Sequence, residues 1–140
     1  MDSKNQTQKR EIKFRGKRID TGEWVVGNLV MVCNGETLKR YPCIVISYNH
    51  DSFDWHEVHP DSIGQFTGLK DKHDKEIYEG DIISGVHPTN PSVINWGKEY
   101  ASFTIDSKGW AFSHYFHESC DPENIAVIGN TFTKIQNYYK

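Results

Sequence analysis

One cluster of histidines and carboxylates has the residue types that could bind a metal ion. His56 and His59 resemble the two ligands of an HExxH zinc motif, but the second histidine comes one residue early. In an extended segment side chains alternate between faces, so this pair would point in opposite directions and could not chelate one ion. Adding His50, Asp51 and Asp54 makes a metal site conceivable. A polar surface loop explains the segment better, and we expect no metal.

The acidic stretch from residue 71 to residue 81 is a second candidate, because oxygen-rich side chains with a glycine suit a calcium ion. An EF-hand needs ligands at loop positions 1, 3 and 5 and a glutamate at position 12, and the spacing here does not match. We interpret the stretch as a tight turn between β elements. Glu79 and Asp81 could do acid–base work, but the sequence has no nucleophile or phosphate-loop motif. The sequence therefore predicts neither an enzyme nor a cofactor.

Charge is distributed unevenly along the chain. Residues 1–18 hold seven basic and two acidic side chains, a balance of +5, whereas the whole chain carries −3. The rest of the chain is therefore acidic, with a balance of −8. A basic arm of this kind can attract phosphate in nucleic acid or in a nucleotide, and salt weakens that attraction. The simpler interpretation is a solvated tail that neutralises its own body or a neighbouring subunit.

Short apolar segments separated by turn residues dominate the chain. Aromatic residues make up 13% of the sequence, which favours a β-rich core over one of long aliphatic helices. At 140 residues the default is a single domain, residues 10–140, preceded by a disordered polar tail, residues 1–9. The expected fold is mostly β, a small barrel or sandwich of short antiparallel strands with little helix. Strands are predicted at 12–19, 24–33, 43–47, 55–59, near 82–83, and at 93–96, 101–105, 110–116 and 125–128.

The three cysteines, Cys33, Cys43 and Cys120, form neither a CxxC pair nor an even disulfide set, and no apolar leader precedes them. A reducing cytoplasm fits this pattern best. The predicted hairpin of residues 24–33 and 43–47 would place Cys33 and Cys43 in the same neighbourhood, and we expect buried thiols there. No apolar run reaches the roughly 18 residues that a membrane helix needs, so we expect no membrane association.

Four blocks of the sequence resemble one protein family. Residues 10–17 (REIKFRGK), 63–72 (IGQFTGLKDK), 76–83 (EIYEGDII) and 127–130 (VIGN) occur in this order and resemble the blocks of the YopX family. The resemblance spans most of the chain and implies a β-rich phage or prophage protein with no established catalytic residues. It supplies fold and origin rather than mechanism. His73 and Asp74 stand where the family often has asparagine and glycine, which leaves the conformation of that turn open.

The conspicuous residues of these blocks have a structural and a functional interpretation. Structurally, the glycines permit tight backbone geometry and the apolar residues fill the core. Functionally, Gln65, Thr67 and Lys70 project polar atoms from a rigid turn into a cleft, beside Arg15 and an aromatic residue such as Trp24. The predicted ligand-binding residues are Arg15, Lys17, Trp24, Gln65, Thr67 and Lys70.

Three functions follow as hypotheses. In the first, a phage counter-defence factor binds and sequesters a nucleotide-derived signalling molecule by aromatic stacking and by Arg or Lys on phosphate. In the second, an acidic surface binds and inhibits a host protein. In the third, the basic arm and exposed aromatics bind nucleic acid, although the acidic body counts against this. Exposed strand edges also make a homo-oligomer plausible.

Overall fold

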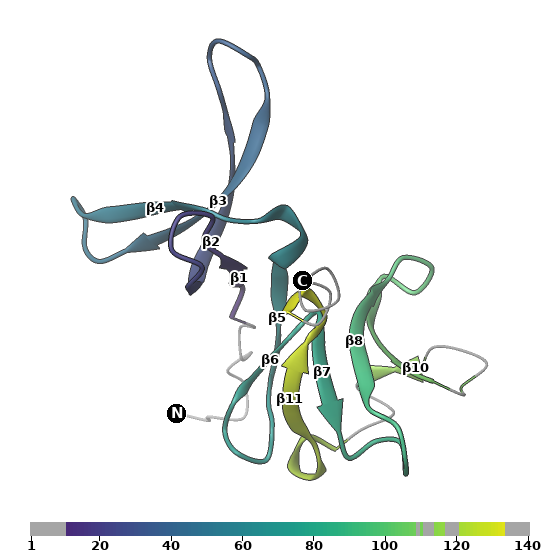
Figure 1. Ribbon diagram of the computed structural model, residues 1–140. Coiled ribbons are helices and arrows are strands. Elements are labelled where there is room, and N and C mark those ends of the chain that lie inside the picture. The colour runs from purple at the N-terminus through teal and green to yellow at the C-terminus, as the bar shows by residue number, and fades with distance from the viewer. Residues whose placement is uncertain (1–10, 109, 111–113, 117–120, 134–140) are drawn as a thin grey trace, which may run out of the picture.

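The computed structural model describes residues 11–108, 110, 114–116 and 121–133, which fold into two antiparallel sheets (Figure 1). The six-stranded sheet has the order β4-β3-β2-β1-β5-β6, and the five-stranded sheet has the order β10-β9-β8-β7-β11. The first sheet comprises β1 (Phe14–Lys17), β2 (Trp24–Cys33), β3 (Arg40–Ser47), β4 (Phe53–Glu57), β5 (Gly64–Lys70) and β6 (Glu76–Tyr78). The second comprises β7 (Asp81–Ser84), β8 (Ser92–Gly97), β9 (Ser102–Ser107), β10 (His114–Tyr115) and β11 (Ala126–Asn130). The short 3₁₀ helices η2 (Pro60–Ser62) and η3 (Pro122–Asn124) lie in connections between strands.

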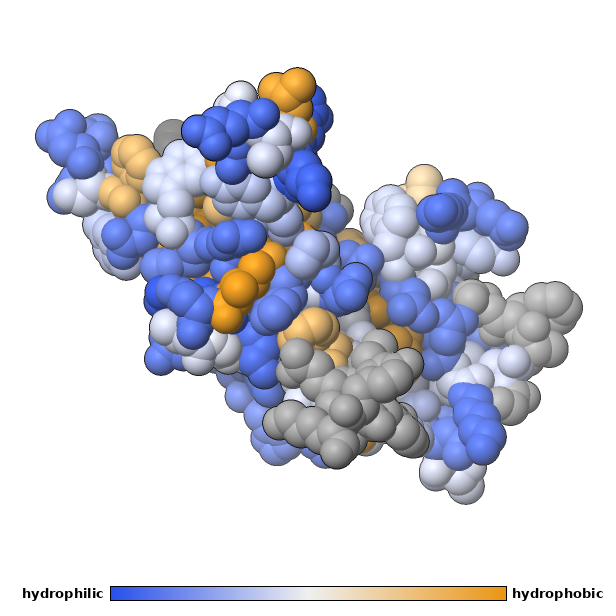
Figure 2. Space-filling model, turned by 45° about the horizontal axis from the view of Figure 1, so that its top comes forward, coloured by the Kyte–Doolittle hydropathy of each residue, from blue (hydrophilic) through white to orange (hydrophobic). Residues whose placement is uncertain are grey.

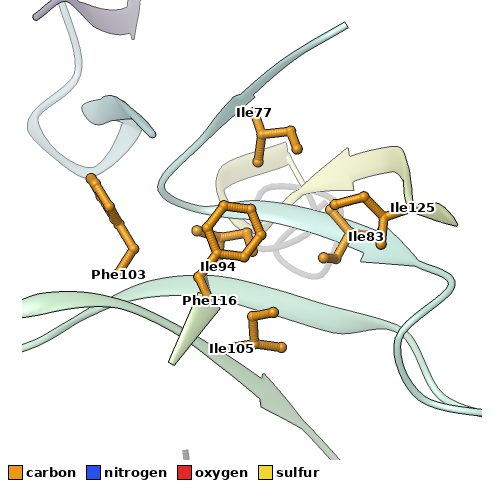
Figure 3. Close-up of a cluster of buried hydrophobic side chains, with 7 residues drawn as sticks. All are labelled: Ile77, Ile83, Ile94, Phe103, Ile105, Phe116 and Ile125. Carbon is orange, nitrogen blue, oxygen red and sulfur yellow. The ribbon is translucent and has the colours of Figure 1, made fainter. Parts of the chain in front are cut away.

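The main hydrophobic core lies against the five-stranded sheet (Figure 3). Buried positions alternate along β7 and β8, because successive side chains of a strand point to opposite faces. Each fully buried isoleucine contributes about 1.5–3 kcal/mol relative to an exposed one. Ile77 comes from β6 and so brings the end of the six-stranded sheet onto this core. The cluster consists of Ile77, Ile83, Ile94, Phe103, Ile105, Phe116 and Ile125.

Strands β2, β3 and β4 extend away from this core as an arm (Figure 1). The β2–β3 hairpin turns at Asn34, whose side-chain oxygen accepts the N–H groups of Glu36 and Thr37 at 2.9 and 3.1 Å. Met31 and Leu38 of this hairpin are exposed. The outer part of the hairpin therefore depends on its ladder of backbone hydrogen bonds, whereas the base of the arm is also packed, since Cys43 and Ile44 of β3 are buried.

The prediction of a mostly-β fold with short antiparallel strands is confirmed. The two sheets remain open and do not close into a barrel, and the contact through Ile77 packs them in the manner of a sandwich. Of the predicted strand at 110–116, the described part shows only His114–Tyr115. The predicted disordered tail, residues 1–9, lies outside the described residues.

Residues 63–72 differ from expectation, because the expected turn is instead strand β5. Gly68 has a φ of 92°, in the region that favours glycine. The register between β5 and β6 shifts between the pairs Phe66–Tyr78 and Lys70–Glu76. The turn-forming glycine is thus accommodated inside a strand as a bulge.

The expectation for the cysteines is confirmed for Cys43 and wrong for Cys33. Cys43 is buried, and burial raises the pKa of its thiol above the ordinary value. Cys33 is exposed. Cys43 pairs with Val30, three residues before Cys33, so the two thiols lie on opposite faces of the hairpin. Cys120 lies outside the described residues.

Asp71 fastens the β5–β6 turn to the five-stranded sheet. Its buried carboxylate accepts the N–H groups of His73 and Lys75 within the turn, at 2.8 and 3.0 Å, and that of Val127 in β11, at 2.9 Å. Burial opposes ionisation of Asp71, but these three donors outweigh burial and hold its pKa below the ordinary value. The acidic stretch that suggested calcium therefore starts with a turn whose first carboxylate is occupied by backbone donors.

Replacing Asp71 by asparagine should lower the free energy of unfolding by about 1–3 kcal/mol, because buried N–H groups lose their charged acceptor. A carboxylate with a lowered pKa stabilises the fold above the ordinary value of 3.8 and loses that effect as the pH falls through the folded-state pKa. Asp71→Asn should therefore lose part of the acid sensitivity of the parent. Urea unfolding at neutral pH and at a pH below 3.8 measures both effects. The control is Asp74→Asn, at an exposed position of the same turn; equal losses in the two variants would contradict this role.

Candidate functional site

A buried ion pair joins the two sheets. Nη1 of Arg15 in β1 lies 2.6 Å from Oδ1 of Asp81 in β7, and their side chains are 13% and 1% exposed. The other carboxylate oxygen accepts the backbone N–H of Tyr78 at 2.7 Å. Burial raises the pKa of Asp81 above its ordinary value, and Arg15 and the Tyr78 N–H offset part of that rise. The first and third sequence blocks, far apart in the chain, therefore meet at one charge pair.

Two aromatic rings enclose the Arg15 guanidinium. Its central carbon lies 5.1 Å from the ring centroid of Trp24 and 5.0 Å from that of Tyr78, within the range of cation–π attraction. Arg15 pairs with Val26 across β1 and β2, so Trp24 is its diagonal neighbour on the same face of the sheet. Strand register thus places Trp24 beside the arginine, and Tyr78 of β6 supplies the second ring.

Gly64 allows the backbone of the next turn to approach this pair. A Cβ at Gly64 would overlap the carbonyl oxygen of Glu79. Nη2 of Arg15 donates to that same carbonyl at 3.4 Å. Gly80, which follows, has a φ of 89° and completes the turn into β7. The glycines of the signature blocks are needed here for close approach, as the structural interpretation expected.

A cleft of about 180 Å³ lies beside Arg15, at the junction of the two sheets. We call it the inter-sheet cleft. Trp24 and Phe132 meet on its lining in an edge-to-face contact, with ring centroids 6.0 Å apart. The acidic residues Asp61 and Glu79 are among its lining residues, beside the neutralised arginine, and Oε1 of Glu79 accepts the N–H of Gln65 at 3.4 Å. The lining residues are Arg15, Trp24, Asp61, Ser62, Ile63, Glu79, Gly80, Asn95, Asn130, Thr131 and Phe132.

The polar side chains of the inter-sheet cleft are held in place by the fold. Ser62 Oγ donates to the carbonyl of His59 at 2.6 Å and accepts the N–H of Lys17 at 2.8 Å, so its hydroxyl serves the backbone. Asn130 Oδ1 accepts the N–H of Thr133 at 2.9 Å, and Asn95 Nδ2 donates to Asp106 at 2.7 Å. A cleft with fixed amides, aromatic edges and carboxylates suits a neutral polar ligand.

The structure brings together Arg15 and Trp24 among the six predicted site residues, since both line the inter-sheet cleft. Lys17 lies nearby, with Nζ 5.8 Å from the ring centroid of Phe132. These three positions come from β1 and from the start of β2. Their ligand-binding role stays a prediction.

Gln65, Thr67 and Lys70 do not line the inter-sheet cleft. Thr67 is buried and its hydroxyl donates to the carbonyl of Ile77 at 2.8 Å, which ties β5 to β6. Gln65 joins the β5 ladder opposite Phe14. Lys70 is exposed, with Nζ 3.6 Å from the carboxylate of Asp74. Because residues 64–70 form a strand rather than a turn, alternation and the bulge direct these side chains elsewhere.

The sequence analysis did not identify several lining residues, among them Asn95, Thr131 and Phe132. Asn130 ends the fourth block of the family resemblance, VIGN, and this was a usable signal. Asn95 and Phe132 carry no motif, and only the folding of both sheets brings them beside Arg15. Among the described residues there is no group of three or more His, Cys, Asp or Glu that could hold a metal ion.

The described end of the basic N-terminal segment, residues 11–18, is largely paired with the protein's own carboxylates. Lys13 contacts Glu76, and Arg18 binds Asp20 through two contacts at 2.7 and 2.9 Å. Together with the Arg15–Asp81 pair, these contacts favour the simpler interpretation, in which the basic N-terminal segment neutralises acidic residues of the same protein. Within the described residues, no helix is long and apolar enough to cross a membrane.

Comparison with known proteins gives one family. Residues 13–134 match the family described as YopX protein. Among solved structures, the crystal structure of protein EF1440 from Enterococcus faecalis is similar at 18% sequence identity and a TM-score of 0.47, over 87% of this chain and 94% of that chain. No curated protein matches the chain.

Replacing Gly64 by alanine should destabilise the protein by about 1–3 kcal/mol, because the new Cβ would push the Glu79 carbonyl away from β5. The control is Gly35→Ala, since a Cβ at Gly35 meets no atom within 4 Å. Thermal or urea unfolding of both variants measures the difference. Equal stability of the two variants would show that this close approach is not required.

Proposed function

The chain belongs to the YopX protein family, which makes it a phage-type accessory protein, and we propose that it acts without catalysis by sequestering a nucleotide-derived signalling molecule of the host's defence. The observation that carries this proposal is the inter-sheet cleft, whose lining includes the paired rings of Trp24 and Phe132, the amide residues Asn95 and Asn130, and Arg15. Sequestration needs affinity alone, so it requires no nucleophile or general base.

The size of the inter-sheet cleft limits which part of such a ligand enters it. Pockets for whole drug-sized ligands have volumes of about 300–1,000 Å³, whereas this cleft has about 180 Å³. A single nucleobase is of the right order. Planar bases present ring faces and edges with donors and acceptors, which aromatic side chains and amides recognise together. The base is therefore the part that the cleft holds.

The charges around the inter-sheet cleft also favour a ligand whose base enters the cleft while its phosphate stays outside. Arg15 is already neutralised by Asp81, and Asp61 and Glu79 also line the cleft, so a phosphate inside it would meet like charge. The exocyclic amino groups of a base could instead donate to these carboxylates. Lys17, beside Phe132, is placed to attract a phosphate that stays outside the cleft. The affinity then depends mainly on the base and only weakly on salt.

A thermal-shift screen of the protein against cyclic nucleotides, ADP-ribose derivatives and short oligonucleotides tests this proposal. A ligand at a hundred times its Kd stabilises the native state by about 2.7 kcal/mol, which raises Tm by several degrees. Because base contacts dominate, the shift should persist at moderate salt. Trp24→Ala should weaken binding by about tenfold or more, as measured by calorimetry.

Lys70→Ala is the matched control, because Lys70 is exposed and away from the inter-sheet cleft. It should leave the affinity unchanged. No shift with any of these compounds would contradict the proposal, as would a loss of affinity in Lys70→Ala equal to that in Trp24→Ala. A shift with oligonucleotides alone, lost at moderate salt, would assign the protein to nucleic-acid binding instead.

A further inference from the structure

Strand β4 forms one edge of the six-stranded sheet. Two backbone hydrogen bonds flank the paired residues of β3 and β4. The N–H of Tyr48 donates to the carbonyl of Ser52 at 2.8 Å, and the N–H of Val58 donates to the carbonyl of Pro42 at 3.2 Å. Along an antiparallel edge, residues bonded to the neighbouring strand alternate with residues whose backbone groups point outward. The even-numbered residues of β4 therefore bond to β3, and the odd-numbered ones face away from the sheet.

The outward backbone groups of Phe53 and Trp55 form an open edge. Glu57, the next residue of this series, has its carbonyl occupied by the N–H of Ile19 at 3.0 Å, which confirms the direction and closes that end. In the part of the chain that the structure describes, no hydrogen bond reaches the outward groups of Phe53 or Trp55. This is the arrangement to which an extended segment can add as a further strand.

The side chains of this edge offer an apolar face. Phe53 and Trp55 are 52% and 50% exposed, and their rings meet edge to face with centroids 5.9 Å apart. They lie on one face of the sheet because they are two residues apart, and Val45 is the cross-strand partner of Trp55. Figure 2 shows hydrophobic patches interrupting the otherwise hydrophilic surface of the arm. Exposed aromatic residues beside unpaired backbone groups are typical of recognition sites.

The charge of the same region selects the kind of occupant. Residues 48–58, which comprise β4 and the turn before it, contain no lysine or arginine, whereas they contain the three acidic residues Asp51, Asp54 and Glu57. A second copy of β4 would bring two such acidic segments together, and like charges across neighbouring strands are destabilising. A basic segment would instead meet complementary charge.

We propose that β4 is a docking edge for an extended, basic segment of a partner protein, which adds to the six-stranded sheet as a new edge strand. Alternate residues of the segment are apolar and cover Phe53 and Trp55. The residues between them are basic and lie on the face of Asp54. Backbone hydrogen bonds to the outward groups of Phe53 and Trp55 supply the affinity, and the charge pattern supplies the specificity. This edge is separate from the inter-sheet cleft and binds independently of any ligand there.

A fluorescein-labelled peptide of about eight residues, in which lysine and valine alternate, tests the docking edge by fluorescence anisotropy. The full chain should bind this peptide and not a peptide in which glutamate and valine alternate. Trp55→Pro removes an outward N–H without removing a bond to β3, and edge strands tolerate proline at such a position. This variant should weaken binding at least about tenfold.

Asp54→Lys provides a second variant that keeps the edge backbone intact. It should weaken binding of the lysine–valine peptide and create binding of the glutamate–valine peptide. Asp74→Lys, at an exposed acid in the β5–β6 turn, should change neither affinity. Circular dichroism and Tm establish whether each variant is folded. If Trp55→Pro is not folded, the peptide binding of Asp54→Lys decides whether the proposal holds.

Three results would overturn the proposal. The first is no peptide binding, or binding equal in the parent and in Asp54→Lys. The second is self-association of the parent that Trp55→Pro abolishes, which would assign the edge to a second copy. The third is peptide binding that appears only after deletion of residues 1–10, which would assign the edge to the chain's own basic segment. None of these results depends on the nucleotide screen.

Discussion

The buried pair of Arg15 and Asp81 is the interaction on which the arrangement of the two sheets depends. Moving two charges out of water costs several kcal/mol for each ion, and only close pairing with further hydrogen bonds and contacts offsets that cost. Here the offset comes from the 2.6 Å contact, from the Tyr78 N–H on Asp81 and from the rings of Trp24 and Tyr78 near Arg15. Because β1 and β7 belong to different sheets, the pair also fixes the walls of the inter-sheet cleft.

Sequence reasoning was most successful where local patterns decide the structure. Alternating apolar residues and turn clusters located most of the strands. The family blocks contain Arg15 and Asp81, but only Arg15 was predicted as a site residue, and nothing in the sequence showed that the two meet. The strand at 64–70 was missed because a bulge at Gly68 has the same local signature as a turn. Asn95 and Phe132 could not be assigned to a site, since only the packing of the two sheets brings them beside Arg15.

Two surfaces with different physical character follow from this fold. The inter-sheet cleft is small, rigid and polar, and it is built where motifs distant in sequence converge. The β4 edge lies on the arm, away from the main core. It offers two aromatic rings, acidic charge and outward backbone groups that no hydrogen bond reaches within the described part of the chain. The two surfaces share no residue, so neither requires the other to be occupied.

A double-mutant cycle on Arg15 and Asp81 tests the central claim most directly. The free energy of unfolding would be measured in urea for the parent, Arg15→Met, Asp81→Asn and the double variant. The account predicts a coupling energy of about 2–3 kcal/mol, because each single variant leaves its partner buried without a counter-charge whereas the double variant does not. Additive effects within about 0.5 kcal/mol would show that the pair does not hold the sheets together.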